Sequence, residues 1–260
     1  MSDTEYHPRS NIGATNAPNG FDHSADALTH NQTLNEFDVS ASRKFLETVF
    51  PDDQLFAFQA LPPKGTPADS PLRHQLTQLK IGTLDASAGW LTAMTRSGAN
   101  VYYGLNKIRT GAKSRKAESF SGTMGAVALD LDGAPIHPVE LLFPPAHCVV
   151  TTSTGRAQLL WRVADLPLRH ETDVDQSDII KRLAVLFDGD KGIFDAARVL
   201  RLPGGYNRNY GAPQLVTADY AKGIEPYALR AFLEALERVE SIKGIEWAKD
   251  ASRGLVKAGP

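Results

Sequence analysis

The sequence lacks the features of an exported or membrane-bound protein. It contains a single cysteine, Cys148, which excludes a disulfide within the chain. No apolar run approaches the roughly 20 residues that a transmembrane helix needs. The first residues have neither the basic nor the apolar region of a secretory signal. We therefore expect a cytoplasmic protein that makes no contact with a membrane, in which Cys148 is a small buried apolar side chain.

The chain also lacks a strong net charge, since 28 basic and 30 acidic side chains give a formal charge of −2. The charges are nevertheless unevenly distributed. Residues 1–36 hold five acids and one base, whereas residues 101–117 and 196–210 hold several bases and no acid. Such segments bind phosphates locally even when the net charge is near zero. For the run Lys113–Lys116 taken alone, a solvated loop is the simpler interpretation.

Hydrophobic periodicity predicts a mixture of helices and strands. Helices are expected at 40–50, 85–97, 174–187, 195–202 and 226–239, with a helical turn at 138–142. Strands are expected at 54–60, 74–81, 101–105, 124–132, 148–152, 158–163 and 214–218. Because the two kinds of element do not alternate regularly, they predict an α+β fold with helices mainly on one face of the sheet.

The two ends of the chain differ from its middle. Residues 1–35 are polar and show little periodicity, which predicts a disordered arm. Residues 36–240 are expected to form the working domain, and residues 241–260 a peripheral helix and tail.

Two carboxylates end the clearest buried strand. Side chains alternate along a strand, so Asp130 and Asp132 share a face with two small alanines, while branched apolar residues fill the other face. Neighbouring carboxylates repel each other unless a cation joins them. Oxygen ligands suit Mg²⁺ or Mn²⁺. A strand that runs into a surface Asp-Gly turn is the alternative, but two aspartates within one apolar strand favour a metal site.

A hydroxyl-rich turn and a glycine-rich segment follow. The backbone, Ser153 and Arg156 of the turn are able to hold an anion, although taken alone an ordinary hairpin turn is the simpler interpretation. Farther on, Asp190 offers a third carboxylate. Arg198 and Arg201 are three apart, so they share one side of the helix expected at 195–202, with Asp195 as its N-cap. The segment after this helix, Pro203-Gly204-Gly205 and then Asn207, suggests that backbone and Asn207 approach a ligand.

In this order the three blocks resemble the motifs of the archaeo-eukaryotic primase superfamily, especially RepB-like primases of plasmids and phages and primase-polymerases. The first family motif, an apolar strand ending in Asp-x-Asp, is matched by LDLD at 129–132. The second, a serine-rich turn with His or Gln before an apolar strand, is matched by STGRAQLLW at 153–161. The third is matched by Asp190 and by RVLRLPGGYN at 198–207. The similarity covers about residues 54–220 and includes VYYGLNKI upstream.

The resemblance implies an RRM-like catalytic sheet joined to an N-terminal α/β module, and a metal-dependent nucleotidyltransferase acting on single-stranded DNA with nucleoside triphosphates. Its catalytic and metal-binding carboxylates would be Asp130, Asp132 and Asp190, with Mg²⁺ or Mn²⁺ as cofactor. Its nucleotide-binding residues would be Ser153, Arg156, Gln158, Arg198, Arg201 and Asn207. The basic residues expected along the template are Lys107, Arg109, Lys113, Arg115, Lys116 and Arg208.

Two departures and two alternatives accompany this interpretation. Gln158 replaces the commoner His, and Asn209 stands where many relatives have Lys. A catalytically silent replication initiator is one alternative, which loss of a carboxylate would favour, but none is missing. A rolling-circle nickase is the other, but none of the seven histidines forms the His-x-His pair that it needs. The phosphate loop GxxxxGK[ST] is absent as well, so unwinding is expected to need a separate helicase or replication initiator.

Overall fold

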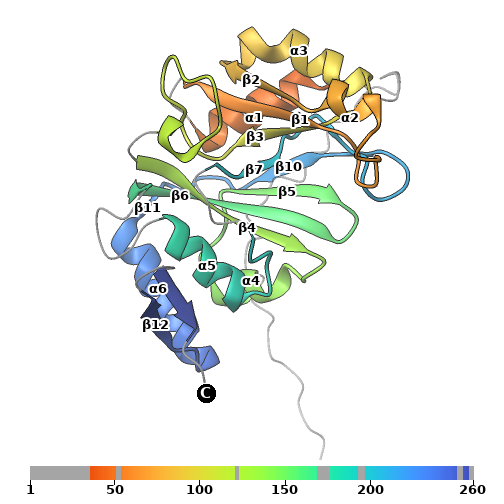
Figure 1. Ribbon diagram of the computed structural model, residues 1–260. Helices are drawn as coiled ribbons and strands as arrows, with labels where there is room; N and C mark the ends of the chain where they lie inside the picture. Colours follow the sequence, from red (N-terminus) through yellow and green to blue (C-terminus); the bar gives the residue numbers. More distant parts are fainter. Residues whose placement is uncertain are drawn as a thin grey trace, which may run out of the picture.

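The computed structural model describes residues 36–50, 54–120, 123–168, 176–192, 197–250 and 254–257. The arm expected at 1–35 and the N-cap expected at Asp195 lie outside these residues. Two mainly antiparallel sheets form the framework of the described chain, one above the other in Figure 1. The expected α+β class is confirmed. No helix in the described ranges is long and apolar enough to cross a bilayer.

The N-terminal sheet has the strand order β2-β1-β3-β7. Its strands are β1 (Phe56–Leu61), β2 (Gln78–Gly82), β3 (Asn100–Gly104) and β7 (Val199–Arg201). Its helices are α1 (Val39–Val49), α2 (Pro71–Leu76) and α3 (Leu84–Arg96). Asp38 caps α1 by accepting hydrogen bonds from the backbone N–H of Ser40 and Ala41. The apolar face of the sheet packs on α1, where the Phe45 and Tyr103 rings meet edge to face with centroids 5.1 Å apart.

The second sheet has the order β10-β5-β6-β11, with β4 paired along the other side of β6. Its strands are β4 (Thr123–Asp132), β5 (Cys148–Ser153), β6 (Arg156–Pro167), β10 (Thr217–Tyr220) and β11 (Tyr227–Ala228). Its helices are α4 (His137–Leu142), α5 (Gln176–Leu186) and α6 (Leu229–Lys243). Shorter elements are the 3₁₀ turn η1 (Ala117–Ser119) and the paired strands β8 (Tyr206–Asn207) and β9 (Gln214–Leu215).

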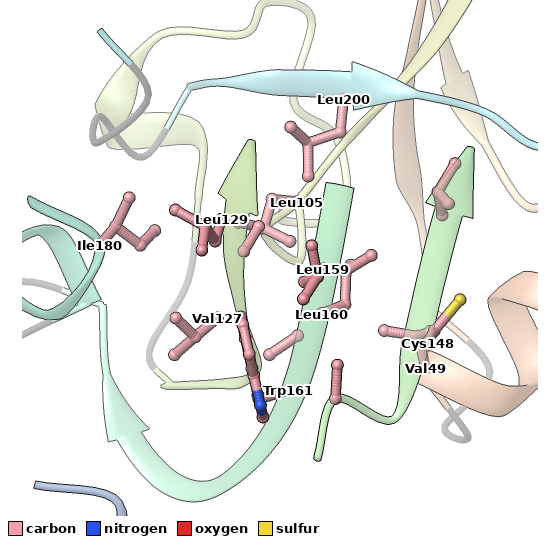
Figure 2. Packing of buried hydrophobic residues seen from close by; sticks show 14 of the residues in the cluster. Val49, Leu105, Val127, Leu129, Cys148, Leu159, Leu160, Trp161, Ile180 and Leu200 are labelled. Carbon is pink, nitrogen blue, oxygen red and sulfur yellow. The ribbon is translucent and has the colours of Figure 1, made fainter. Parts of the chain in front are cut away.

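Alternation along β4 places Asp130 and Asp132 on one face and Val127 and Leu129 on the other, as the sequence predicts. Val127, Leu129 and Trp161 are fully or almost fully buried. Figure 2 shows Val127 and Leu129 pointing toward Ile180 of α5. The Trp161 indole N–H donates to the Pro144 carbonyl at 2.8 Å, so this large ring is buried without an unpaired donor. The apolar face therefore holds β4 in place, and the carboxylates on its other face lie on the side away from α5.

Three expectations about elements are wrong. The helix expected at 195–202 is absent from its described part, where β7 pairs with β3 and places Leu200 opposite Tyr103. Strand pairing far along the chain has overridden the helix-like spacing of the two arginines. The strand expected at 74–81 starts only at Gln78, because Pro71 begins the short helix α2.

The third expectation concerns residues 241–260, where a peripheral helix and tail were predicted. Gly244 adopts a left-handed conformation with φ 61° and ends α6. The strands β12 (Trp247–Asp250) and β13 (Gly254–Lys257) then pair antiparallel as a hairpin. A local glycine signal therefore stops the helix, and a two-stranded sheet takes the place of the expected helix.

Candidate active site

The two aspartates of β4 lie directly opposite two polar residues of β6. Cross-strand register pairs Asp130 with Gln158 and Asp132 with Arg156. The Gln158 Nε2 donates to Asp130 Oδ2 at 3.1 Å. Arg156 forms an ion pair with Asp132 through its Nε. Because side chains alternate along both strands, two motifs that are 24 residues apart in the chain become one polar array.

Asp190 reaches this array through the end of α5. Asp188 has a left-handed backbone with φ 54°, and the Gly189 N–H donates to the Ala184 carbonyl at 2.9 Å. The chain then turns toward β4, where the Asp190 N–H donates to the Asp130 carbonyl at 2.8 Å. The Asp190 carboxylate is exposed, and its Oδ1 accepts from the Gly192 N–H at 2.8 Å. A backbone hydrogen bond thus ties Asp190, which carries the third expected carboxylate, to Asp130, which carries the first.

The surroundings of Asp130 disfavour its charged form. Burial first, and then the charges of Asp190 and Asp132, raise the pKa of Asp130, which reaches about 6. The hydrogen bond from Gln158 and the charge of Arg201 oppose this rise without cancelling it. A hard divalent cation is the partner that such oxygen atoms fit. In the described chain, however, no group of three or more potential ligand side chains is assembled for a metal, and Arg156 engages Asp132.

The N-terminal sheet supplies the other side of the site. Gln59, Tyr102 and Arg201 lie in register across β1, β3 and β7, on the face opposite the one that packs on α1. The Arg201 guanidinium carbon lies 5.0 Å from the Tyr102 ring centroid, and its Nη1 donates to Asn100 Oδ1 at 3.2 Å. Burial lowers the pKa of Arg201, and the charges of Tyr102, Tyr210 and Asp130 oppose that effect. Arg201 is therefore a buried cation within electrostatic reach of the Asp130 carboxylate.

The loop between β8 and β9, residues 208–213, closes over this region. The Asn209 Oδ1 accepts from Asn100 Nδ2 and from the Lys64 N–H, both at 2.9 Å. The Arg156 guanidinium carbon lies 3.9 Å from the centroid of the Tyr210 ring. Sequence reasoning did not select Asn100, Tyr102 or Tyr210 as residues of the site. The only signal for Tyr102 was the resemblance of the VYYGLNKI segment to the primase family, and that resemblance assigned Tyr102 no role.

Two polar atoms of the site are buried without a partner. The Ser153 Oγ and the Gln158 Oε1 form no hydrogen bond with the described residues. A buried group of this kind costs free energy, on the order of 1–3 kcal/mol, unless something satisfies it. Both residues were expected to contact a nucleotide. Their unsatisfied atoms are consistent with a polar ligand at this turn.

Several other expected site residues are engaged by the protein itself. The Asn207 Nδ2 donates to the Thr152 carbonyl at 3.0 Å. The Arg208 guanidinium donates to the carbonyls of Thr95 and Ala99, at the end of α3. The glycines after Leu202 allow a close backbone crossing, since a Cβ at Gly204 would overlap the carbonyl oxygen of Asp38. We expected the backbone of this segment to approach a ligand. It approaches the start of α1 instead.

The basic loop, which runs from Lys107 to Lys116, folds onto the N-terminal sheet. The Arg115 guanidinium donates to Gln59 Oε1 and to the Ala197 carbonyl, and Arg109 Nε donates to the Phe120 carbonyl. The lysines of the loop are exposed at positions Lys107, Lys113 and Lys116. Arg198 donates to the carbonyl of Gly192, two residues after Asp190. It does not share a helix face with Arg201, because Arg201 lies in the strand β7. The loop is thus attached beside the site through Arg115, with its lysines toward solvent.

Comparison with known proteins gives one family and several similar structures. Residues 72–236 match the RepB DNA-primase N-terminal domain. The AEP domain of the primase-polymerase (PrimPol) of cyanophage S-2L has a TM-score of 0.59 and 18% identity, covering 77% of this chain and 99% of that chain. Primase RepB′ has a TM-score of 0.54 and 17% identity, covering 79% of this chain and 63% of that chain.

A further similar structure is the catalytic domain of RepB′ in complex with initiator DNA. It has a TM-score of 0.53 and 17% identity, covering 79% of this chain and 95% of that chain. At these identities the likeness to the solved structures concerns the fold. No curated protein matches the chain.

Proposed function

Since the chain belongs to the RepB DNA-primase family, we propose that it is a metal-dependent nucleotidyltransferase that makes or extends primers on single-stranded DNA. The family match confirms the resemblance to archaeo-eukaryotic primases and supports DNA priming as the class of function. The proposal includes nucleoside triphosphates as substrates, Mg²⁺ or Mn²⁺ as cofactor and a separate helicase or initiator as partner. Replication of a plasmid or phage is the setting that the family suggests.

The observation that carries this proposal is the convergence of three chain segments on Asp130. Asp132 shares its strand face, Gln158 donates to its carboxylate, and the Asp190 backbone is bound to its carbonyl. We assign Asp130, Asp132 and Asp190 as the residues that would hold the cation. A divalent cation held there would supply the charge that activates a primer 3′-hydroxyl and stabilises the departing pyrophosphate. Asp132 is paired with Arg156, so Arg156 would have to release it before its carboxylate could join a cation site.

The remaining roles belong to residues around the carboxylates. We assign Ser153, Gln158 and Arg156 to the triphosphate, because the first two hold unsatisfied buried polar atoms and the third is a partly exposed cation beside Asp132. Arg201 would offset charge near Asp130 from the N-terminal sheet. The exposed lysines of the basic loop, with Arg198, are the candidates for template phosphates. The RepB′ catalytic domain was solved with initiator DNA, which supports DNA as the partner.

A strand-synthesis assay tests the proposal. The protein is incubated with unprimed single-stranded circular DNA, labelled nucleotides and Mg²⁺ or Mn²⁺, and the products are separated on a gel. We expect new strands from the natural protein and none from Asp132→Asn. The matched control is Asp219→Asn, an aspartate on the opposite face of the same sheet, which should remain active. Binding of single-stranded DNA without synthesis under any of these conditions would favour the silent initiator instead.

A further inference from the structure

Tyr210 is an aromatic side chain that a loop with two anchors holds against Arg156, beside Asp132. Its exposed fraction is 38%, and few large apolar side chains among the described residues are as exposed. On one side of it, Asn209 is bound to Asn100 and to the Lys64 backbone. On the other, the Gln214 Oε1 accepts from the Thr154 N–H at 2.8 Å. The backbone that carries the ring is therefore fixed, although the ring itself is open to solvent.

A guanidinium lies over the Tyr210 ring. The Arg156 guanidinium carbon lies 3.9 Å from the ring centroid, a stacking distance, and the same group pairs with Asp132. Arg156 side-chain exposure is 31%, so solvent and solutes reach this contact. A planar group lying on an exposed ring occupies the position that a flat aromatic ligand would take.

An aromatic face beside a phosphate-binding arginine has the two parts that a nucleotide needs. Arg156 is next to the turn whose Ser153 Oγ is buried and unsatisfied, so triphosphate oxygens bound there would compete with Asp132 for the guanidinium. Once Arg156 turns to the phosphates, the ring face is free. Stacking on an aromatic side chain tolerates every base, because every base has a π-face.

We propose that Tyr210 stacks on the base of the incoming nucleoside triphosphate, and that Arg156 covers the ring when no nucleotide is bound. This inference rests on the proposed function, since it names a contact of the same nucleotide. It separates two contributions to binding: Arg156 and the turn hold the phosphates, and Tyr210 holds the base. Tripolyphosphate, which has no base, should therefore bind without the contribution of Tyr210.

Equilibrium titration of the full chain with dATP and with tripolyphosphate, in Mg²⁺ and without DNA, tests the inference. Base stacking predicts that the natural protein binds dATP about 5- to 100-fold more tightly than tripolyphosphate. Tyr210→Phe keeps the ring and should keep this preference. Tyr210→Leu should lose it, and its affinity for tripolyphosphate should not fall, because Arg156 then has no ring contact to leave. Tyr210→Ser repeats the test if the leucine variant does not fold, which the circular dichroism spectrum shows.

The outcomes separate this inference from the proposed function. Equal affinity of the natural protein for dATP and tripolyphosphate, or an unchanged preference in Tyr210→Leu, would overturn the stacking role and leave strand synthesis untouched. If Tyr210→Leu binds dATP normally but binds an oligothymidylate more weakly, the ring stacks on a template base and the inference is wrong. Failure of the natural protein to bind either ligand would overturn the proposed function itself.

Discussion

At the scale of single residues, Asp130 works against the stability of its own fold. Burial and the neighbouring charges of Asp190 and Asp132 raise its pKa from 3.8 to about 6. Between these two values the folded protein holds a proton that the unfolded chain has released. The contribution of Asp130 to stability is therefore highest at low pH, and it is lost as the pH rises through about 6.

Asp130→Asn should consequently stabilise the protein while abolishing strand synthesis. At pH 8 we expect the free energy of unfolding to rise by about 1–3 kcal/mol, since the amide removes a buried charge and still accepts from Gln158. Near pH 4 the two proteins should differ little, because the wild-type carboxyl is then protonated in the folded state. Urea denaturation at both pH values measures this. Asp132→Asn is the control, because Asp132 is exposed and paired with Arg156. A variant less stable than wild type at pH 8 would contradict the argument.

The residues that could be predicted from the sequence are those whose signal is local. Alternation along 126–132 was enough to place Asp130 and Asp132 on one face, and the structure shows that face. Asn100 and Tyr210 carry no such signal. Asn100 is a buried centre of hydrogen bonds only because Arg201 and Asn209, about a hundred residues away, meet it. The sequence does not distinguish Asn100 and Tyr210 from other polar residues of strands and loops. Only the pairing of β3 with β7 shows that Asn100 lies beside Arg201.

At the scale of elements, the segment 188–190 controls where the third carboxylate lies. It follows α5, crosses β4 and binds the Asp130 carbonyl through the Asp190 N–H. The crossing is so close that a Cβ built on Gly189 would stand 2.5 Å from Leu129 Cδ1 and 2.9 Å from the Asp130 oxygen. Leu129 is buried, so neither neighbour can move cheaply.

Gly189→Ala should therefore displace Asp190 and impair both stability and synthesis. We expect the free energy of unfolding to fall by about 1–3 kcal/mol, the usual cost of overpacking, and the strand-synthesis rate to fall with it. Gly89→Ala is the matched control, because Gly89 lies in α3 with open space at its Cβ, where alanine favours the helix. Thermal denaturation and the gel assay measure the two effects. Wild-type activity in Gly189→Ala would show that Asp190 is not needed at this position.

Element boundaries could be predicted where hydrophobic periodicity and capping residues agreed. They could not be predicted where the pairing of distant strands decides whether a segment is a helix or a strand. The strands β4, β5 and β6 and the helices α1, α3 and α5 lie close to their expected positions. The short strand β7 does not, because the spacing of Arg198 and Arg201 fits a helix and only its partner β3 makes it a strand. Sheet pairing depends on residues far along the chain, and a single sequence does not show it.

At the scale of the whole molecule, the candidate site lies where the N-terminal sheet meets the second sheet. The second sheet supplies Asp130 and Gln158, and the N-terminal sheet supplies Arg201 and Tyr102. The chain returns to the N-terminal sheet through β7 after it has left Asp190, and this return brings Arg201 near the carboxylates. The α+β class could be predicted from element order, whereas this return could not, since it depends on which sheet β7 joins.

The boundary between the expected arm and the working domain can be tested by deletion. The described contacts begin at Glu36, which pairs with Arg96, and continue with Phe37, which is buried. Asp38 binds the Gly204 carbonyl through its N–H and caps α1. Residues 1–35 contain few apolar side chains, so they can offset little of the roughly 1–2 kcal/mol per residue that ordering a backbone costs.

A chain that begins at Asn35 should therefore fold and synthesise strands like the full chain. A chain that begins at Val39 is the matched control, because it loses the Phe37 side chain and the Asp38 cap. Its free energy of unfolding should fall by about 3 kcal/mol or more, the sum expected for a buried phenylalanine and an N-cap. Denaturation followed by circular dichroism and the strand-synthesis assay compare the three proteins. If the chain from Asn35 loses synthesis while its spectrum and unfolding midpoint stay unchanged, the first 34 residues belong to the working site, and the domain boundary must move toward the N-terminus.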